Sequence, residues 1–456
     1  MTPATSRFLS TTLTMTISPL LLAAFGLTGV IVGRLVFDRW FNHLTIYSSI
    51  WGAGLALFEM RLIDYYPLVE EVWMLIGYAW VAFAAGSMIA IVAQRAVGIS
   101  PASPTTAPLE RQTASEGRIF SFAILILSAI ALISTLRRWL VLISMFGGIP
   151  GVLVNGYTIY RMRIAGETPG AVPYLSSFAL AAILICGLYC ARAGKIKLIV
   201  LIPLLIIILD DVSMAGRAKM SLGVALFVSG YFLARLQART AQTLRTRGRL
   251  RWILTFSLIF SLLLVAAEFV RSYRGAYERF YGASQELSKL EQNAFLTPSI
   301  YLYLSSHVGV FNAYWKSGGE RYFPGSNTFA PVFRILAKLK VGDPVPHFTK
   351  FYNTPVSSNT GTYLRELHAD FGVAGILIAP FVLGWACTLL WSQIRVRSGL
   401  AMIALLAHFY VIVVFTFLYQ VTRVGEWFVS LAASLFVCGF INHFLKNTAA
   451  TGVRRN

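Results

Sequence analysis

Apolar runs of about 20 residues recur along the whole chain, and each is long enough to cross the ~30 Å hydrocarbon core of a bilayer as a helix. The 456 residues are 57% hydrophobic and 13% charged, whereas an ordinary soluble domain carries about 25% charged residues. This composition excludes a soluble globular protein, a disordered chain and a fibrous one. It predicts an all-α polytopic integral membrane protein with about eleven (about ten to twelve) transmembrane helices.

The apolar runs place the predicted spans at 17–37, 43–61, 72–94, 119–136, 173–191, 196–210, 218–237, 252–270, 372–394, 399–421 and 427–445. No cleavage pattern follows the first run, so we expect it to stay as a membrane helix. Trp139 to Val154 is also apolar, but Gly147-Gly148 and Pro150 interrupt it. We interpret it as an interfacial or re-entrant segment. If it spans instead, the count becomes twelve and the amino terminus moves to the cytoplasm.

The segment from Arg235 to Arg251 fixes the orientation, because it holds six arginines and no acid. Short basic connections stay in the cytoplasm, so this segment and the linker near 95–118 are predicted to be cytoplasmic. The carboxyl-terminal tail, 446–456, falls on the same side. The net charge of +20 is then a consequence of membrane topology, and we expect no nucleic-acid partner.

This orientation divides the chain into four parts. Residues 1–270 form an amino-terminal membrane region of about eight spans, and residues 271–371 form one large extracytoplasmic loop. Residues 372–445 supply three more spans before the cytoplasmic tail. A loop of this length is functional or disordered, and its many aromatic side chains favour a folded cap.

Two groups of basic residues lie where predicted spans meet the extracytoplasmic face. Arg217 and Lys219 occupy the turn between two spans, and Arg271 and Arg274 end the eighth span. Charges at membrane depth are costly and usually mark function, and arginine suits bidentate binding of phosphate oxygens. Both groups at one face predict a shared anion site, such as one for a lipid-linked diphosphate.

A simpler interpretation treats these arginines as structural. Arg217 has Asp210 and Asp211 nearby in the chain, and Arg271 has Glu268, so each arginine can form an ion pair. Long basic side chains at span ends also extend into the lipid headgroups.

The end of the large loop, 357–372, carries a third group of ionisable residues. On a helix beginning near Thr362, Glu366 and Asp370 share one face, and Arg365 and His368 share another. His368, Glu366 or Asp370 can therefore serve as a general base for a sugar hydroxyl, with Arg365 at the anion site. The alternative is an Arg–carboxylate pair that caps the helix start.

The cysteines and the remaining ionisable residues are interpreted as structural. The four cysteines all lie in apolar runs, and Cys186 and Cys190 share a helix face without a histidine or carboxylate, so we expect packing residues and no metal site. His307 and His347 are interpreted as structural, and Arg423 with Glu426 as a surface ion pair.

In order and placement, these features resemble the oligosaccharide repeat unit polymerases, the O-antigen polymerase group of bacterial surface-polysaccharide assembly. The resemblance covers most of the chain: ten to twelve spans, one large periplasmic loop late in the chain, and three short motifs. These motifs are Ala215-Gly216-Arg217-Ala218, Tyr273-Arg274-Gly275, and Asn359-Thr360 followed by Asp370-Phe371-Gly372 and Gly375. The resemblance implies the membrane glycosyltransferase C-type architecture of ligases and polymerases.

The resemblance also implies an inverting glycosyl transfer at the periplasmic face of the bacterial inner membrane. The donor is a growing glycan on polyprenyl diphosphate, and the acceptor is the terminal hydroxyl of a new lipid-linked repeat. The diphosphate would bind the five basic residues named above, and Tyr301, Tyr303 and Asn359 would contact the glycan. No cofactor or metal is expected, whereas a chain-length regulator and a flippase are possible partners.

Three alternatives remain open. An O-antigen ligase uses a similar donor and depends on a loop histidine, a role that His307, His347 or His368 can fill. A polyprenyl-phosphate-sugar glycosyltransferase would place acidic residues in the first external loop, where Asp64, Glu70 and Glu71 lie. A lipid-linked glycan flippase or transporter would show charges near mid-membrane.

Overall fold

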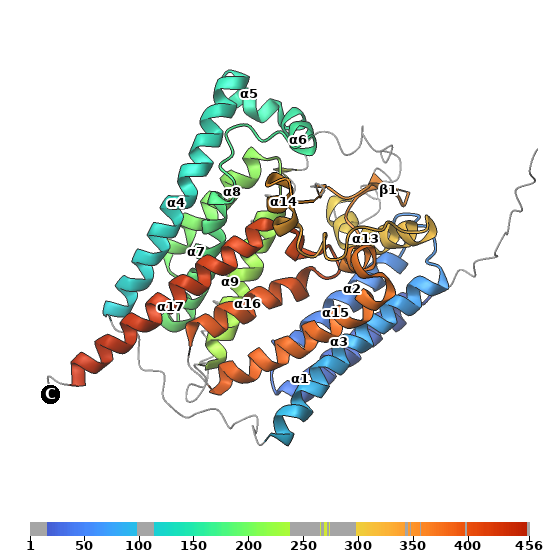
Figure 1. Ribbon diagram of the computed structural model, residues 1–456, viewed down its shortest axis with the longest axis horizontal. Coiled ribbons are helices and arrows are strands. Elements are labelled where there is room, and N and C mark those ends of the chain that lie inside the picture. The colour runs from blue at the N-terminus through green and yellow to red at the C-terminus, as the bar shows by residue number, and fades with distance from the viewer. Residues whose placement is uncertain are drawn as a thin grey trace, which may run out of the picture.

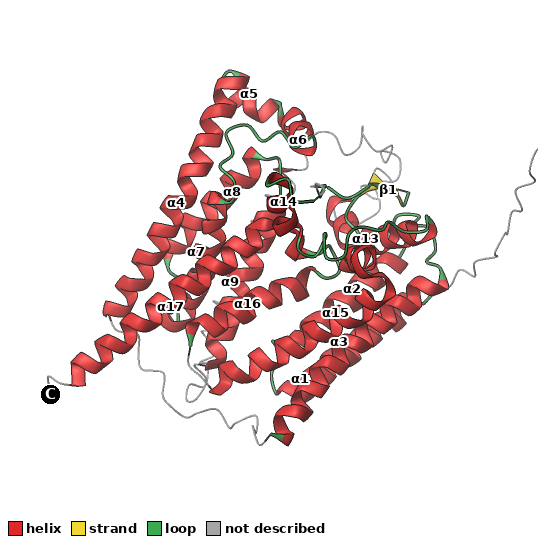
Figure 2. Ribbon diagram, in the orientation of Figure 1, coloured by secondary structure: helices red, strands yellow, loops and turns green. Residues whose placement is uncertain are grey.

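The computed structural model describes residues 16–97, 114–237, 265, 269–270, 273, 298–342, 345–346, 348–355, 357–396 and 399–453. Within these ranges the chain is mostly helical, as Figure 2 shows. Strands β1 (Tyr352–Asn353) and β2 (Ser357–Ser358) form a small antiparallel hairpin. The predicted all-α class is confirmed for these residues.

The helices follow one another along the chain with the bounds α1 (Pro19–Phe37), α2 (His43–Glu59), α3 (Glu70–Ala96), α4 (Ala114–Phe146), α5 (Ile149–Val154), α6 (Gly156–Ile164), η1 (Leu175–Ser177), α7 (Phe178–Ala193), η2 (Leu198–Val200), α8 (Leu201–Ser213), α9 (Ala218–Gln237), α13 (Pro298–Lys316), α14 (Ala330–Lys338), α15 (Tyr363–Val396), α16 (Leu400–Phe415), η3 (Val421–Arg423) and α17 (Gly425–Val453).

Seven of the described helical segments are long and apolar enough to cross a membrane. They belong to α1, α3, α4, α7, α9, α15 and α17. The predicted spans 43–61, 196–210 and 399–421 correspond to the shorter helices α2, α8 and α16. The predicted span 252–270 lies almost entirely outside the described residues. A multi-pass membrane protein follows from these helices.

Glycine allows the closest helix contact, between α3 and α15. A Cβ atom added at Gly86 would lie 2.0 Å from the carbonyl oxygen of Phe381, and one at Gly384 would lie 2.2 Å from that of Phe83. Membrane helices lack a hydrophobic driving force against each other, so small residues that permit close backbone approach supply the packing. These two glycines therefore join the amino-terminal and carboxyl-terminal halves of the bundle.

The non-spanning elements gather at one end of the bundle. Figure 1 shows α5, α6, α13, α14 and β1 at the end opposite the carboxyl terminus. We call these elements, together with the first two turns of α15, the cap. α13, α14 and the hairpin all come from the predicted 271–371 loop, so the described part of this loop is folded. The turn between α8 and α9 and the start of α15 meet these elements, and they carry the predicted site residues.

Trp139 to Val154 is divided between two helices and is not one separate segment, and its interfacial or re-entrant position stays a prediction. Helix α4 continues through Trp139 and ends at Phe146. Gly147 and Gly148 then take positive φ angles of 73° and 123°, and the short α5 begins at Ile149. The apolar sequence sustains a helix until the first glycine pair, because nothing before it breaks the hydrogen-bond ladder.

Gly372 separates the cap from the membrane part of α15. Its φ of 64° and ψ of −155° are non-helical, and this region is essentially restricted to glycine. The first two turns of α15 therefore point in their own direction before the apolar part begins at Val373.

We predict that Gly372→Ala lowers the free energy of unfolding by about 1–3 kcal/mol, the usual cost of such a backbone conformation for an L-residue. A Cβ atom there would meet nothing within 4 Å, so the effect is one of backbone strain alone. Gly77 lies inside α3 and also has nothing within 4 Å. Gly77→Ala should leave the thermal midpoint in detergent unchanged or raise it. A fall of equal size in both variants would contradict the assignment of strain.

Candidate active site

Asp211 holds the turn between α8 and α9. Its Oδ2 accepts the backbone N–H of Met220 at 2.8 Å, and its carbonyl oxygen accepts the N–H of Gly216 at 2.7 Å. A Cβ atom at Gly216 would lie 2.9 Å from both Asp211 Oδ1 and Arg163 Nη1. Glycine at this position therefore lets Arg163 of α6 approach the turn that carries Arg217.

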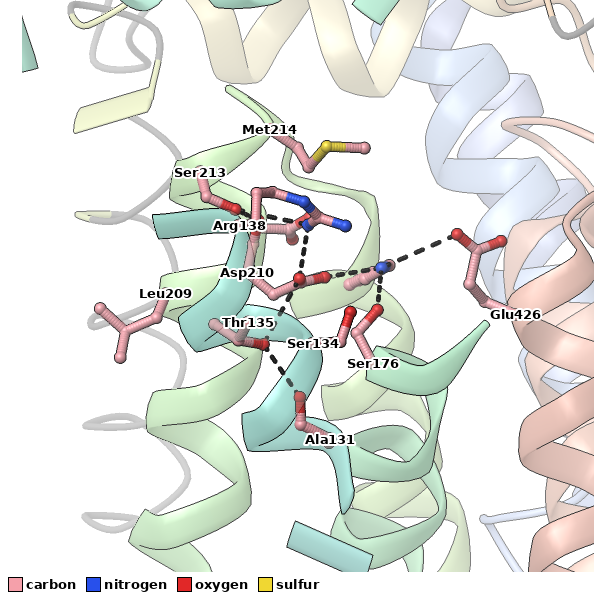
Figure 3. Close-up of polar contacts among 12 residues, drawn as sticks. Ala131, Ser134, Thr135, Arg138, Ser176, Leu209, Asp210, Ser213, Met214 and Glu426 are labelled. Carbon is pink, nitrogen blue, oxygen red and sulfur yellow. Dashed lines mark hydrogen bonds and ion pairs between the residues drawn. The ribbon is translucent and has the colours of Figure 1, made fainter. Parts of the chain in front are cut away.

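Asp210, the residue before Asp211, joins its own helix α8 to α4 and α9. Its Oδ1 accepts from Arg138 Nη1 at 2.6 Å, and its Oδ2 accepts from Lys219 Nζ at 2.6 Å (Figure 3). Lys219 also donates to Ser176 Oγ at 2.7 Å and lies 3.7 Å from Glu426 Oε1. The predicted anion ligand Lys219 is thus bound to Asp210, and this network fixes the turn against α4 and α17.

We predict that Asp210→Ala lowers the free energy of unfolding by about 3–5 kcal/mol, because it leaves two buried cations without their carboxylate. The Asp210 side chain is 2% exposed. The control is Asp38→Ala, which removes an Arg34–Asp38 pair of 2.9 Å whose carboxylate is 67% exposed; such a pair contributes about 1 kcal/mol or less. Equal losses of thermal midpoint in the two variants would contradict the structural role of Asp210.

Arg217 and Arg163 both lie over aromatic rings. The Arg217 guanidinium is 4.7 Å from the centroid of the Tyr303 ring on α13. Arg163 is 6.0 Å from the ring of Phe348 and donates to the carbonyl of Met214 at 3.5 Å. A ring contacts the flat face of a guanidinium and leaves the N–H groups at its edge for other partners. The cap elements therefore orient two arginines beside the α8–α9 turn.

Arg423 is buried, so the interpretation of Arg423 and Glu426 as a surface ion pair is wrong. Arg423 is 8% exposed and donates to Asn327 Oδ1 and, at 2.7 Å, to the carbonyl of Pro346. Glu426 lies beside Lys219 instead. The chain distance between Arg423 and Glu426 suggested a local pair, but the cap folds over η3 and supplies different partners.

Arg334 connects Arg423 to the rest of the site. It donates to the Arg423 carbonyl at 3.5 Å. Burial lowers the pKa of Arg334, the charge of Arg423 lowers it further, and Glu426 opposes both. We define the basic cluster as Arg163, Arg217, Lys219, Arg334 and Arg423, which come from α6, the α8–α9 turn, the start of α9, α14 and η3 respectively.

Asp370 is saturated by hydrogen bonds. Its Oδ1 accepts from the backbone N and the Nδ2 of Asn327, both at 2.9 Å, and its Oδ2 accepts from the backbone N and the Oγ1 of Thr328, both at 2.7 Å. A carboxylate has about four acceptor positions, so all are occupied here. Asp370 holds Asn327, whose side chain in turn binds Arg423.

Glu366 lies one turn earlier on the same helix face and is differently placed. It is 3% exposed, and its Oε2 has no hydrogen-bond partner within the described part of the chain. Burial lowers the pKa of Arg423, and the charge of Glu366 is the main effect opposing that shift, so the two groups are close. An unsatisfied buried carboxylate oxygen is costly and often marks a position for a ligand group.

His368 lies on the other face of α15. Its Nδ1 is 2.8 Å from the hydroxyl of Tyr314, which donates to the carbonyl of Glu320 at 3.2 Å. A carbonyl oxygen only accepts, so both contacts of the Tyr314 hydroxyl are hydrogen bonds when its proton goes to Glu320 and His368 Nδ1 carries its own proton. In the neutral imidazole, Nε2 is then the acceptor. Glu366 and His368 are thus both available as bases but serve different surfaces.

Arg365, predicted to bind the diphosphate, contacts the protein itself. It is 2% exposed and donates to the carbonyls of Asn359 at 2.9 Å and Lys350 at 3.1 Å. Its Nη2 is 3.6 Å from Glu320 Oε2. These contacts attach the hairpin region to α15.

The predicted glycan ligands differ in accessibility. Tyr301 is fully buried, and its hydroxyl donates to the carbonyl of Leu57 and accepts from the N–H of Leu62, so it joins α13 to α2. Tyr303 is 39% exposed and lies under Arg217. Asn359 is half-buried, and its carbonyl accepts from Thr349 and Arg365.

Arg271 and Arg274 lie outside the described residues, as does His347. Tyr273 is described, and its hydroxyl donates to the carbonyl of Val152 in α5 at 2.9 Å. Among the described residues, no group of three or more His, Cys, Asp or Glu side chains could hold a metal ion.

Sequence reasoning passed over three arginines, Arg138, Arg163 and Arg334, and misinterpreted a fourth, Arg423. Arg138 carried a signal, because a charge at the end of an apolar run requires a buried partner. Arg163 and Arg334 lie in short cap helices without a motif.

No protein-family model, no curated protein and no solved structure matches the chain.

Proposed function

We propose that the protein is a membrane glycosyltransferase that polymerises polyprenyl-diphosphate-linked oligosaccharide repeat units at the periplasmic face of a bacterial inner membrane. The observation that carries this proposal is the proximity of Arg423, a member of the basic cluster, to Glu366, a buried carboxylate whose Oε2 lacks a partner among the described residues. Both lie where apolar helices end, the depth at which the diphosphate of a lipid-linked glycan is found. The carboxyl terminus is then cytoplasmic.

The arginines of the basic cluster supply the donor site in this proposal. Arg217 and Arg163 are held by ring contacts and hydrogen bonds beside a turn that Asp211 and Asp210 make rigid. Guanidinium groups bind phosphate oxygens in pairs of hydrogen bonds. Fixed cations stabilise the charge that develops on the departing diphosphate, and they need no rearrangement during the reaction. Arg271 and Arg274 remain predicted members of this site.

Glu366 is the proposed general base. It accepts the proton of the acceptor hydroxyl, and the oxygen attacks C1 of the sugar attached to the donor diphosphate. The new C1–O bond forms on the face opposite the leaving group, so the configuration inverts. The bond between C1 and the diphosphate oxygen breaks, and its electron pair leaves with the polyprenyl diphosphate. Asp370 is a positioning residue, because its oxygens are occupied by Asn327 and Thr328.

An O-antigen ligase is the second candidate, and His368 favours it. Its Nε2 is an acceptor when Nδ1 donates to Tyr314, and a histidine-dependent transfer to lipid A core then has a base available. A transporter is less favoured, because α6, α14 and the α8–α9 turn, which carry residues of the basic cluster, lie at one end of the bundle (Figure 1).

The released lipid distinguishes these reactions from a polyprenyl-phosphate-sugar transferase. Purified protein in detergent is given a polyprenyl-diphosphate repeat unit, and the lipid products are separated by chromatography. We expect one polyprenyl diphosphate for each new glycosidic linkage. Release of polyprenyl monophosphate from a monophosphate donor, with no reaction of the diphosphate donor, would contradict the proposal.

A further inference from the structure

A cavity of about 440 Å³ lies between the end of α13 and the kink of α15. Its volume is within the range of about 300–1,000 Å³ that is typical of small-molecule sites. Trp315, Arg321, His368 and the backbone of Gly318 and Gly372 contribute to its walls. The cavity therefore opens on the His368 face of α15.

This cavity is separate from Arg217, whereas Arg423 of the basic cluster is linked to the cavity wall through Asn327 and Asp370. Helix α13 holds both Trp315 and Tyr303, and the ring of Tyr303 contacts the Arg217 guanidinium. They are twelve positions apart, which at about 1.5 Å per residue gives a separation of ~18 Å along the helix axis. A sugar whose C1 is bonded to the diphosphate at Arg217 does not reach this cavity. A more distant part of a glycan does.

The two carboxylates in the cavity lining each have an arginine nearby that does not line the cavity: Arg365 Nη2 is 3.6 Å from Glu320 Oε2, and the charge of Asp370 acts on Arg423. Glu320 Oε1 also accepts from the Tyr352 hydroxyl at 2.8 Å and its Oε2 from the Tyr322 hydroxyl at 2.9 Å. Asp370 is saturated by Asn327 and Thr328 as described above. Arg321 is exposed and is the cation among the lining residues. With these two acids balanced by Arg365 and Arg423, the Arg321 guanidinium is the group in the lining that attracts an anionic ligand.

The remaining walls suit a sugar ring. The Trp315 and His368 rings meet edge to face, with centroids 5.0 Å apart and an interplanar angle of 63°. Trp315 is half-buried and so offers apolar ring surface to the C–H face of a sugar. When His368 Nδ1 donates to Tyr314, the arrangement that satisfies both contacts of that hydroxyl, Nε2 accepts a hydrogen bond from a sugar hydroxyl.

We propose that this cavity binds a carboxylated sugar residue, with the ring on Trp315, a hydroxyl on His368 Nε2 and the carboxylate on Arg321. That the sugar belongs to the glycan being extended rests on the proposed function; the binding itself does not. The site would select repeat units that contain a hexuronic acid.

The test is calorimetric titration of the purified full-length protein in detergent with trigalacturonic acid, using neutral maltotriose for comparison. We expect trigalacturonic acid to bind at least tenfold more tightly than maltotriose. Arg321→Gln should remove that preference and leave maltotriose binding as it is, whereas Trp315→Ala should weaken both. Gel filtration and thermal midpoints check that each variant is folded.

Arg217→Ala is the matched control, because it removes an arginine ~18 Å away and should leave trigalacturonic acid binding unchanged. Retained binding with lost polymerisation in this variant separates the two sites. No binding of trigalacturonic acid to the wild type, equal affinity for maltotriose, an unchanged preference in Arg321→Gln, or displacement by an equal concentration of inorganic phosphate would each overturn the proposal.

Discussion

Replacing Arg217 by alanine is expected to abolish polymer formation while the protein still inserts and folds. Arg217 lies beside the α8–α9 turn with its guanidinium face on Tyr303, so the substitution removes a fixed donor of bidentate hydrogen bonds. Loss of one such donor to a developing oxyanion lowers a rate by about 10²–10³-fold. The measurement is the rate of polymer formation by the purified variant in detergent.

Two companion variants define the cause. Arg217→Lys should recover only part of the rate, because an ammonium group supplies a point charge instead of a planar fork. Arg95→Ala removes an exposed arginine from the last turn of α3 and should behave as the wild type. Wild-type chain lengths from Arg217→Ala would remove this residue from the site. Full activity of Arg217→Lys would show that charge alone matters.

Glu366→Gln is expected to reduce the transfer rate by about 10²–10⁴-fold, the usual contribution of a general base. Glutamine has nearly the same shape and keeps one carbonyl oxygen, but it cannot accept the acceptor's proton at neutral pH. Affinity for the lipid-linked donor should therefore stay near that of the wild type. Single-turnover rates and donor binding, measured on the same preparation, separate the two effects.

Glu167→Gln is the matched control, because Glu167 is exposed and lies just beyond α6 in the cap. It should leave the transfer rate unchanged. Wild-type rates from Glu366→Gln would exclude Glu366 as the base and leave His368 as the candidate. A weaker donor affinity with an unchanged single-turnover rate would assign Glu366 to positioning of Arg423.

The membrane helices were predictable because their signal is local. A run of about 20 apolar residues has to be helical in lipid, where every backbone group needs an internal partner. The predicted spans 17–37 and 218–237 therefore match α1 and α9 closely. Which residues share a helix face also follows from their spacing in the sequence. The spacing of Glu366 and Asp370 therefore placed both carboxylates on one side of α15.

Partners distant in the sequence were not predictable. Asp210 binds Arg138, which lies 72 positions earlier in the chain, and Asp370 binds Asn327, which lies 43 positions earlier. Neither pair follows from a motif, because both depend on how α4 and the cap pack against the bundle. Arg423 shows the consequence. A nearby acid in the sequence suggested a surface ion pair, but the cap provides two buried hydrogen-bond acceptors, the Asn327 side chain and the Pro346 carbonyl.

The most direct test of the polymerase proposal uses purified protein, one polyprenyl-diphosphate repeat unit and gel separation of the glycan products. The proposal predicts a ladder in which each band exceeds the previous one by one repeat unit. Transfer onto added lipid A core without a ladder would identify a ligase. Neither product, from protein shown to be folded and with the native repeat unit, would contradict a glycosyltransferase and favour a transporter.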